Sequence, residues 1–287
     1  MKIFVTGATG FTGLFFKYAA EAAGHQVVAL QSDLTDKAAV AAEVLQVLPD
    51  AVVHLAGISF VGHIDETAFY GVNVVGTLNL LEGLAALPVK PDKVLLVSSA
   101  NVYGNCDTSP ITEDHPPAPV NHYAMSKLAM EYMARTYLDR LPLLFARPFN
   151  YSGPGQSPNF LIPKLVNHFA LLAPSIDLGN LHTEREFNDV RMVCDAYLGL
   201  LAHGESGEVY NICSGQPYTV RRVLDELQII TGHQLDVRVN PAFVRANELH
   251  RLCGDPSKLH RLLGQYGITL KTPSLSAMLC EMLAAAT

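Results

Sequence analysis

The sequence has few charges, no tryptophan, no basic run and no long apolar run. Only 16% of its 287 residues are charged and 49% are hydrophobic, which excludes a disordered chain because there is ample apolar surface to bury. The net charge of −7 argues against nucleic-acid binding, which depends on neutralising phosphates. A membrane-spanning helix needs about 20 consecutive apolar residues, and the sequence contains no such stretch. The first apolar run stops at Thr6-Gly7. We therefore expect a cytoplasmic protein.

Cysteine and histidine also form none of the usual ligand patterns. The five cysteines are odd in number and far apart, at Cys106, Cys194, Cys213, Cys253 and Cys280. No C-x-x-C pair occurs, and the eleven histidines form no H-E-x-x-H motif. We expect free thiols in a reducing compartment and no metal.

Short apolar runs alternate with amphipathic stretches through the first 150 residues. We predict strands at 2–5, 26–30, 51–55, 93–97 and 143–146, and helices at 11–23, 36–48, 65–87 and 121–139. This alternation predicts a parallel sheet covered on both faces, in a Rossmann-type doubly wound α/β fold.

The amino-acid composition changes after Arg147-Pro148. Residues 151–158 are rich in glycine, proline and serine, which marks a loop and a domain edge. We predict an NAD(P)-binding core over 1–150, to which a segment of about 185–215 returns. A smaller α/β substrate-binding cap is predicted over 151–287.

Three glycines follow the first predicted strand in a G-x-x-G-x-x-G pattern, at Gly7, Gly10 and Gly13. Gly7 permits the tight turn, Gly10 lets the backbone approach a pyrophosphate, and Gly13 allows close packing of helix on strand. The free N–H groups and positive dipole of the helix would hold the anion. The pattern predicts binding of a dinucleotide.

The choice between NAD and NADP stays open at this point. A carboxylate after the second strand usually binds the ribose of NAD, whereas an arginine suits the 2′-phosphate of NADP. Here the strand runs into Leu30-Gln31-Ser32, without a charge. Asp33 follows, either at the ribose or at the start of the next segment facing the adenine.

A tyrosine and a lysine lie four residues apart, at Tyr123 and Lys127, on one predicted helix face. A neighbouring cation lowers the pKa of a phenol, so we expect Lys127 to activate Tyr123 as an acid–base group. Ser98 and Ser99 end the fourth predicted strand, at the edge where such folds collect active-site groups.

These motifs together resemble the extended short-chain dehydrogenase/reductases, in particular their sugar-nucleotide branch. The resemblance covers essentially the whole chain and is closest to the GDP-4-keto-6-deoxy-D-mannose reductases, which make GDP-D-rhamnose. The matching segments are 6–13, 54–57, Asn73 with 76–77, 98–104, 123–127, 147–150 with 153–156, 185–187 with 189–190, 210–215, Arg245 with Glu248, and 254–255 with Lys258.

The resemblance implies roles for individual residues. The implied catalytic set is Ser99, Tyr123 and Lys127. The residues implied to bind NAD(P)(H) are Gly7, Thr9, Gly10, Phe11, Thr12, Gly13, Asp33, Leu34, Leu55, Ala56, Gly57, Asn73, Ser98, Tyr123, Lys127 and Arg147. Those implied to bind the nucleotide sugar are Ser59, Ser99, Asn150, Arg185, Arg245 and Glu248.

Departures from the family pattern favour one reaction. Related 4,6-dehydratases carry acidic residues at the positions of Ala100 and Asn101, and related epimerase-reductases carry a cysteine at Asn101. Among the reactions of the family, these departures leave reduction of a C4 ketone as the expected one, and its product is GDP-D-rhamnose or its 6-deoxytalose epimer. A 4-epimerase with tightly bound NAD and a non-catalytic NAD(P)-binding regulator are the alternatives. Glu186 and Met192 also depart from the pattern, within the expected sugar pocket.

The family also implies an assembly. Its members commonly form homodimers through two long helices of each subunit, here the predicted helices at 65–87 and 121–139. We therefore expect a four-helix interface.

Overall fold

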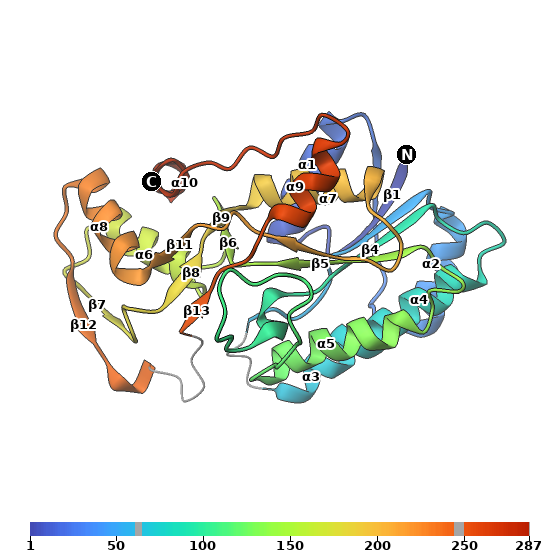
Figure 1. Cartoon of the computed structure of the whole chain (residues 1–287), viewed down its shortest axis with the longest axis horizontal. Coiled ribbons are helices and arrows are strands. Elements are labelled where there is room, and N and C mark those ends of the chain that lie inside the picture. The colour runs from blue at the N-terminus through green and yellow to red at the C-terminus, as the bar shows by residue number, and fades with distance from the viewer. Residues whose placement is uncertain (61–64, 244–249, 287) are drawn as a thin grey trace.

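The structure is a computed structural model that describes residues 1–60, 65–243 and 250–286. A six-stranded parallel sheet forms its centre, in the order β10-β5-β4-β3-β1-β2 (Figure 1). These strands are β1 (Lys2–Thr6), β2 (Gln26–Ala29), β3 (Ala51–His54), β4 (Lys93–Val97), β5 (Leu143–Pro148) and β10 (Val209–Ile212). Strands β3 and β5 are buried along their whole length, as continuous apolar runs require in a sheet covered on both faces.

Helices cover both faces of the sheet (Figure 1). On one face lie α1 (Phe11–Ala22), α7 (Val190–His203) and α9 (Ser257–Gly264), which share an apolar core with the strands. On the other face lie α2 (Lys37–Val47), α4 (Thr77–Ala86) and α5 (His122–Arg135). The expected Rossmann-type α/β fold is confirmed.

The long helix expected over 65–87 is present, but its winding changes. It consists of α3 (Glu66–Tyr70), a π-helical segment (Gly71–Gly76) and α4, in unbroken succession. A π-helical segment accommodates an extra residue in the turn, so it rotates the side chains that follow it, and such segments are frequent at functional sites. The buried Asn73 lies in this segment.

The chain leaves the sheet after β5 and builds a second core. Helices α6 (Leu161–Ala170), α8 (Val220–Thr231) and α10 (Leu275–Ala286) pack there with β7 (Ser175–Leu178). Strand β7 pairs with β12 (Asp236–Val239), and β8 (Glu184–Glu186) pairs with β11 (Pro217–Thr219) and β13 (Arg251–Leu252). Strands β6 (Tyr151–Ser152) and β9 (Asn188–Asp189) form a further pair. None of the described helices has the length and apolarity needed to span a bilayer.

A buried ion pair fastens α5 to the sheet. Arg147 on β5 donates from Nε to Glu131 Oε1 at 3.0 Å and from Nη2 to Glu131 Oε2 at 2.6 Å. The two side chains are 5% and 2% exposed, so water screens them little. The guanidinium also lies over the ring of Tyr103, 4.8 Å from its centroid, and Tyr103 donates to Asn211 on β10 at 2.7 Å.

We expect Glu131→Ala to destabilise the protein by about 3–5 kcal/mol, because it leaves a buried guanidinium without its counter-charge. The double variant Glu131→Leu with Arg147→Met is expected to cost less, since it buries no charge. Urea unfolding followed by circular dichroism measures both free energies. A double variant less stable than Glu131→Ala would contradict this account of the pair.

Candidate active site

The glycine turn is held by contacts that leave no room for side chains at Gly7 and Gly13. Gly7 has a φ of +69°, and a Cβ there would lie 2.8 Å from the backbone nitrogen of Ala56. A Cβ on Gly13 would lie 2.2 Å from the carbonyl oxygen of Gly7, so the helix packs directly on the turn. The turn is closed by the hydrogen bond from Gly10 N–H to Gly7 O, at 3.1 Å.

The N-terminus of α1 is suited to an anion. Gly10 is its N-cap and makes no side-chain capping bond, and its first turn carries no acidic residue. Among the described residues, a Cβ on Gly10 would approach only the Gly7 oxygen, at 3.3 Å, so they leave the space above the turn open. Uncapped N–H groups at a positive helix end bind phosphates. The turn therefore fits the pyrophosphate of a dinucleotide.

A tyrosine that sequence reasoning did not select lies against this turn. The hydroxyls of Tyr151 and Thr12 are 2.8 Å apart, and the rings of Tyr151 and Phe11 stack at 6.3 Å. Tyr151 begins β6, shortly after β5 ends at Pro148, so it joins the glycine turn to the chain that leads into the second core. The only sequence signal was its position at the start of the glycine- and proline-rich segment over 151–158.

A buried histidine connects the ends of β1 and β3. His54 Nδ1 lies 2.7 Å from Thr6 Oγ1, and His54 Nε2 lies 2.7 Å from Thr77 Oγ1. Burial, with a smaller effect of the Lys127 charge, lowers the pKa of His54 to about 3, so the ring is neutral. Thr6 Oγ1 also accepts from the N–H of Ala56 at 3.0 Å, which fixes the predicted cofactor segment after β3.

Asn73 holds that same segment from the π-helical turn. Its Oδ1 accepts from Ile58 N–H at 2.9 Å, and its Nδ2 donates to Ser126 on α5 at 3.0 Å. A Cβ on Gly57 would lie 2.8 Å from Asn73 Oδ1 and 3.1 Å from Lys127 Nζ. The predicted cofactor residues Gly57 and Asn73 thus meet the predicted catalytic lysine.

The predicted catalytic set comes together at the carboxyl end of β4. Asn121 caps α5 by accepting from Ala124 N–H at 2.9 Å, and this places Tyr123 in the first turn of the helix. Lys127, one turn on, donates to Val97 O at 2.9 Å. Ser99 hydrogen-bonds Tyr123 and is only 6% exposed.

Burial dominates the electrostatics of the set. It raises the pKa of Tyr123, and the hydrogen bond with Ser99 lowers it by less. The lowered pKa that we expected for Tyr123 is therefore wrong for this structure, because burial raises it and the smaller opposing contribution comes from Ser99 and not from Lys127. Burial also lowers the pKa of Lys127 to about 8, with Glu131 acting in the opposite direction.

Ser98 is a buried hydroxyl that finds no partner within the described part of the chain. An unsatisfied buried hydroxyl is unusual and fits a ligand contact. Of the other predicted cofactor residues, Leu34 is buried against Gly76. Asp33 is exposed and accepts from the N–H and hydroxyl of Thr35, both at 2.8 Å, so it opens the next segment.

The predicted substrate residues are placed less closely. Ser59 and Asn150 are exposed, and the Asn150 carbonyl accepts from Asn188 N–H at 2.9 Å. Arg185 lies on β8 and donates to Glu184 O at 2.8 Å. Arg245 and Glu248 lie outside the described residues. The predicted cofactor residue Arg147 makes the buried ion pair described above, so its contacts here are structural.

Glu186, one of the departures from the family pattern, organises the loops beside Arg185. Its Oε2 accepts from the N–H and hydroxyl of Ser214 at 2.7 and 3.0 Å and from Gly215 N–H at 3.2 Å. Its Oε1 accepts from Gly254 N–H at 2.6 Å. The carboxylate is completely buried, and these four bonds compensate its lost hydration. Sequence reasoning identified the departure but not this role.

The fold and the Ser99, Tyr123 and Lys127 set define a short-chain dehydrogenase/reductase-type protein of the epimerase and dehydratase group. The profile of the GDP-mannose 4,6 dehydratase family matches residues 16–266, and the chain belongs to that family. The resemblance inferred from the sequence is thereby confirmed.

Two curated relatives match nearly end to end. A GDP-6-deoxy-D-talose 4-dehydrogenase of Aggregatibacter actinomycetemcomitans is 39% identical, over 98% of this chain and 97% of its own length. A GDP-6-deoxy-D-mannose reductase of Pseudomonas aeruginosa is 37% identical, over 98% and 96%. The solved structure of RMD from Pseudomonas aeruginosa complexed with NADPH has a TM-score of 0.90 and 34% identity, over 99% of this chain and 98% of that one.

We expect Lys127 to make stability increase with pH. Its folded-state pKa is near 8 and its unfolded value is near 10.5, so the unfolded chain binds more protons between these values. The free energy of unfolding should therefore gain about 2 kcal/mol from this group between pH 7 and pH 9.5. Urea unfolding of wild type and Lys127→Met at both pH values measures the difference. Equal pH dependence in the two proteins would refute the assignment.

Proposed function

We propose that this protein reduces the C4 ketone of a GDP-linked 4-keto-6-deoxyhexose, using NAD(P)H. The observation that carries the proposal is the buried set of Ser99, Tyr123 and Lys127 beside a glycine turn that fits a pyrophosphate. The names of the two curated relatives, both GDP-6-deoxyhexose oxidoreductases, support the substrate class. A solved relative with NADPH, and a Thermus thermophilus UDP-glucose 4-epimerase with NAD, support the cofactor class.

The residues account for reduction of a ketone. When bound, the reduced nicotinamide supplies the hydride. Tyr123 is a phenol whose pKa is raised by burial from an ordinary value already above neutral pH, so it is protonated and its hydroxyl can donate that proton to the oxygen that was the carbonyl. Ser99, hydrogen-bonded to Tyr123, stabilises the charge that develops on the same oxygen. Lys127, fixed on Val97 O, places a positive charge beneath the site.

The same site lacks what a 4,6-dehydratase requires. Ala100 and Asn101 are the first two residues of the 3₁₀ turn that follows Ser99. The acidic residues of related dehydratases lie at these two positions. Neither side chain can remove or donate a proton for elimination of water. Hydride transfer with protonation by Tyr123 needs no further group, which favours the reductase within the family.

We place the nucleotide sugar between the core over 1–150 and the cap over 151–287, in contact with Ser59, Ser99, Asn150 and Arg185 on the described side. Arginine suits the pyrophosphate because its fork of donors matches phosphate oxygens. We also propose the cytoplasm as the location, where the five free cysteines stay reduced.

The turnover assay combines the protein with GDP-4-keto-6-deoxy-D-mannose and NADH or NADPH. We expect oxidation of one cofactor per ketone reduced, and NMR of the product at C4 separates GDP-D-rhamnose from GDP-6-deoxy-D-talose. Tyr123→Phe should lower kcat by about 10²–10⁴-fold, since it removes only the proton donor.

Two results of this assay would contradict the proposal. One is a protein that isolates with bound NAD and interconverts sugar epimers without consuming reduced cofactor, which would identify a 4-epimerase. The other is Tyr123→Phe turning over at the wild-type rate. Unchanged cofactor affinity in that variant serves as the control for folding.

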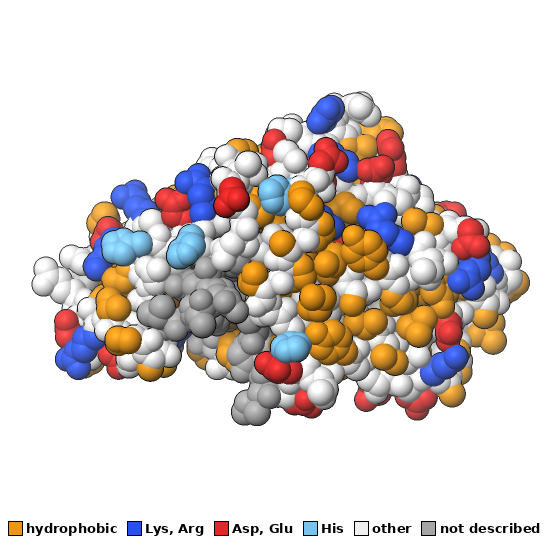
Figure 2. Space-filling view, turned by 60° about the horizontal axis from the view of Figure 1, so that its bottom comes forward, with side chains coloured by type: hydrophobic (Ala, Val, Ile, Leu, Met, Phe, Trp, Pro, Cys, Tyr) orange, Lys and Arg blue, Asp and Glu red, His pale blue; other side chains and the backbone are white. Residues whose placement is uncertain are grey.

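We propose that the chain forms a homodimer through α5 and the helix formed by α3, the π-helical segment and α4. Met125 and Tyr132 lie on the side of α5 opposite Tyr123 and are 44% and 62% exposed, and Val75 is 50% exposed. Figure 2 shows that hydrophobic side chains gather on the face that carries these helices. Apolar helix faces of this kind pack into four-helix interfaces.

Sedimentation equilibrium should give twice the chain mass of 31.1 kDa for the wild type. Tyr132→Glu should shift the mass to one chain, because it buries a charge in the interface. Ile229→Glu is the matched control, since Ile229 is 73% exposed on α8 in the second core. A monomeric wild type would contradict the proposed dimer.

A further inference from the structure

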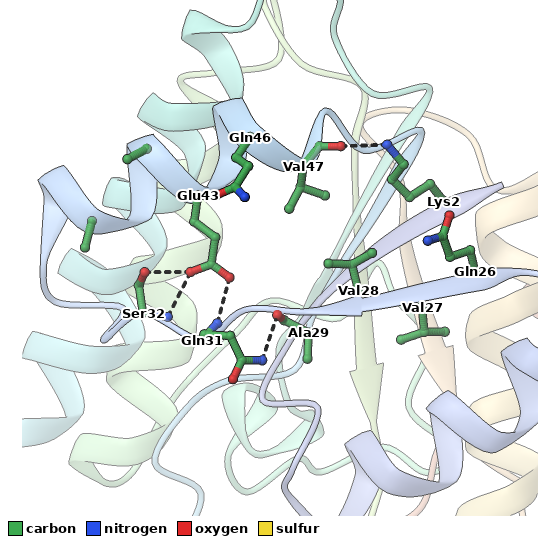
Figure 3. Close-up of a pocket in the computed structure, with 12 residues that line it drawn as sticks. Lys2, Gln26, Val27, Val28, Ala29, Gln31, Ser32, Glu43, Gln46 and Val47 are labelled. Carbon is green, nitrogen blue, oxygen red and sulfur yellow. Dashed lines mark hydrogen bonds between the residues drawn. The ribbon is translucent and has the colours of Figure 1, made fainter.

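A carboxylate from α2 occupies the backbone donors that follow β2. Glu43 Oε1 accepts from Gln31 N–H at 2.8 Å. Its Oε2 accepts from Ser32 N–H at 2.9 Å and from the Ser32 hydroxyl at 2.6 Å. Figure 3 shows Glu43 reaching from α2 across the end of the groove along β2 to these two residues. Three donors thus converge on one ionised side chain.

These donors lie where the fold receives the adenosine half of a dinucleotide. Leu30 N–H donates to Val5 O on β1 at 2.9 Å, so Gln31 begins beside the end of β1, where the glycine turn starts. In Rossmann folds the residues after β2 contact the adenosine ribose, at its free 2′-hydroxyl in NAD or its 2′-phosphate in NADP. Asp33, which the sequence left open between the ribose and the start of the next segment, accepts from the N–H and hydroxyl of Thr35.

Two consecutive N–H groups with a hydroxyl form the kind of concavity that binds anions. Here the chain fills it with its own anion. Partial burial raises the pKa of Glu43, but the hydrogen bonds from Ser32 and from the two backbone N–H groups outweigh this effect and leave the pKa below its ordinary value. A 2′-phosphate would meet a carboxylate at the place where it needs donors.

The neighbouring cations are already engaged. Lys2, the one lysine or arginine among the described residues lining this groove, donates to Val47 O at 2.8 Å, at the opposite end of α2. Lys37, in the first turn of α2, pairs with Glu82 on α4 at 2.6 Å. An arginine or lysine is the usual partner of a 2′-phosphate. A ribose hydroxyl, by contrast, donates to a carboxylate, and Glu43 Oε1 accepts one hydrogen bond among the described residues.

We propose that Glu43 selects NADH over NADPH by occupying the donors of Gln31 and Ser32 and offering an acceptor to the 2′-hydroxyl. The choice of cofactor refines the proposed function, but it rests on the glycine turn and the end of β2 alone. It therefore sets this chain apart from the Pseudomonas aeruginosa relative that was solved with NADPH.

Cofactor titration without any sugar nucleotide tests this directly. The sequence contains no tryptophan, so the emission of bound NADH or NADPH can be followed over a low protein background. We expect wild type to bind NADH at least about tenfold more tightly than NADPH, as expected for a hydrogen bond to a charged group gained or lost.

The variants separate the charge of Glu43 from its shape. Glu43→Gln keeps the size of the side chain and removes its charge, whereas Glu43→Ala leaves the donors of Gln31 and Ser32 without their acceptor. Both variants should reduce the preference for NADH about tenfold or more. Gln46→Ala, which alters the same helix and groove, should leave the ratio of the two dissociation constants unchanged. Thermal melting confirms that each variant is folded.

Two outcomes would overturn the proposal. The first is wild-type protein that binds NADPH as tightly as NADH or more tightly, which needs no variant to be stable. The second is a folded Glu43→Gln whose ratio of dissociation constants equals that of wild type. The titration contains no ketosugar, so its result does not depend on whether the protein reduces one. The proposed preference for NADH and the proposed ketone reduction can therefore fail separately.

Discussion

The hydrogen bond from Lys127 to the carbonyl of Val97 joins helix α5 to the carboxyl end of β4, and the arrangement of the site depends on it. An ammonium buried this deeply loses its hydration, so it is tolerated only where a carbonyl and a nearby carboxylate compensate it. Glu131, one turn further along α5, supplies that carboxylate and also pairs with Arg147 on β5. A continuous series of polar contacts, from Val97 through Lys127 and Glu131 to Arg147, therefore positions the helix and the catalytic lysine on the sheet. Gly57, one of the predicted cofactor residues, lies beside Lys127 and Asn73.

Sequence reasoning predicted the elements that depend on local pattern. The apolar runs identified five of the six parallel strands, β1 to β5, and the glycine spacing identified a turn whose close contacts at Gly7 and Gly13 exclude any side chain. The four-residue spacing of Tyr123 and Lys127 placed both on the buried face of α5. These predictions succeeded because periodicity and backbone sterics act between residues close in sequence.

What the sequence did not reveal depends on residues distant from one another along the chain. The hydroxyl of Tyr151 contacts that of Thr12, and Glu186 accepts hydrogen bonds from the backbone of Ser214 and Gly254. These contacts join segments that only the folded chain brings together. The pKa of Tyr123 was predicted in the wrong direction because it is raised by burial, which the spacing of residues along the chain does not reveal. Arg147 shows the same limit: its position matches a cofactor motif, but its guanidinium is directed at Glu131 and Tyr103.

The place of β10 at the edge of the sheet has a consequence for how the chain acquires its structure. Strand β5 is buried along its length, yet its outer neighbour β10 comes from a segment made after β6, α6 and α7. During synthesis, which proceeds from the N-terminus, the backbone edge of β5 stays unpaired until that later segment has emerged. An unpaired strand edge is a template for pairing with other chains. The nascent protein therefore passes through a stage at which the edge of β5 can pair with other chains, and β10 ends this stage by pairing with β5.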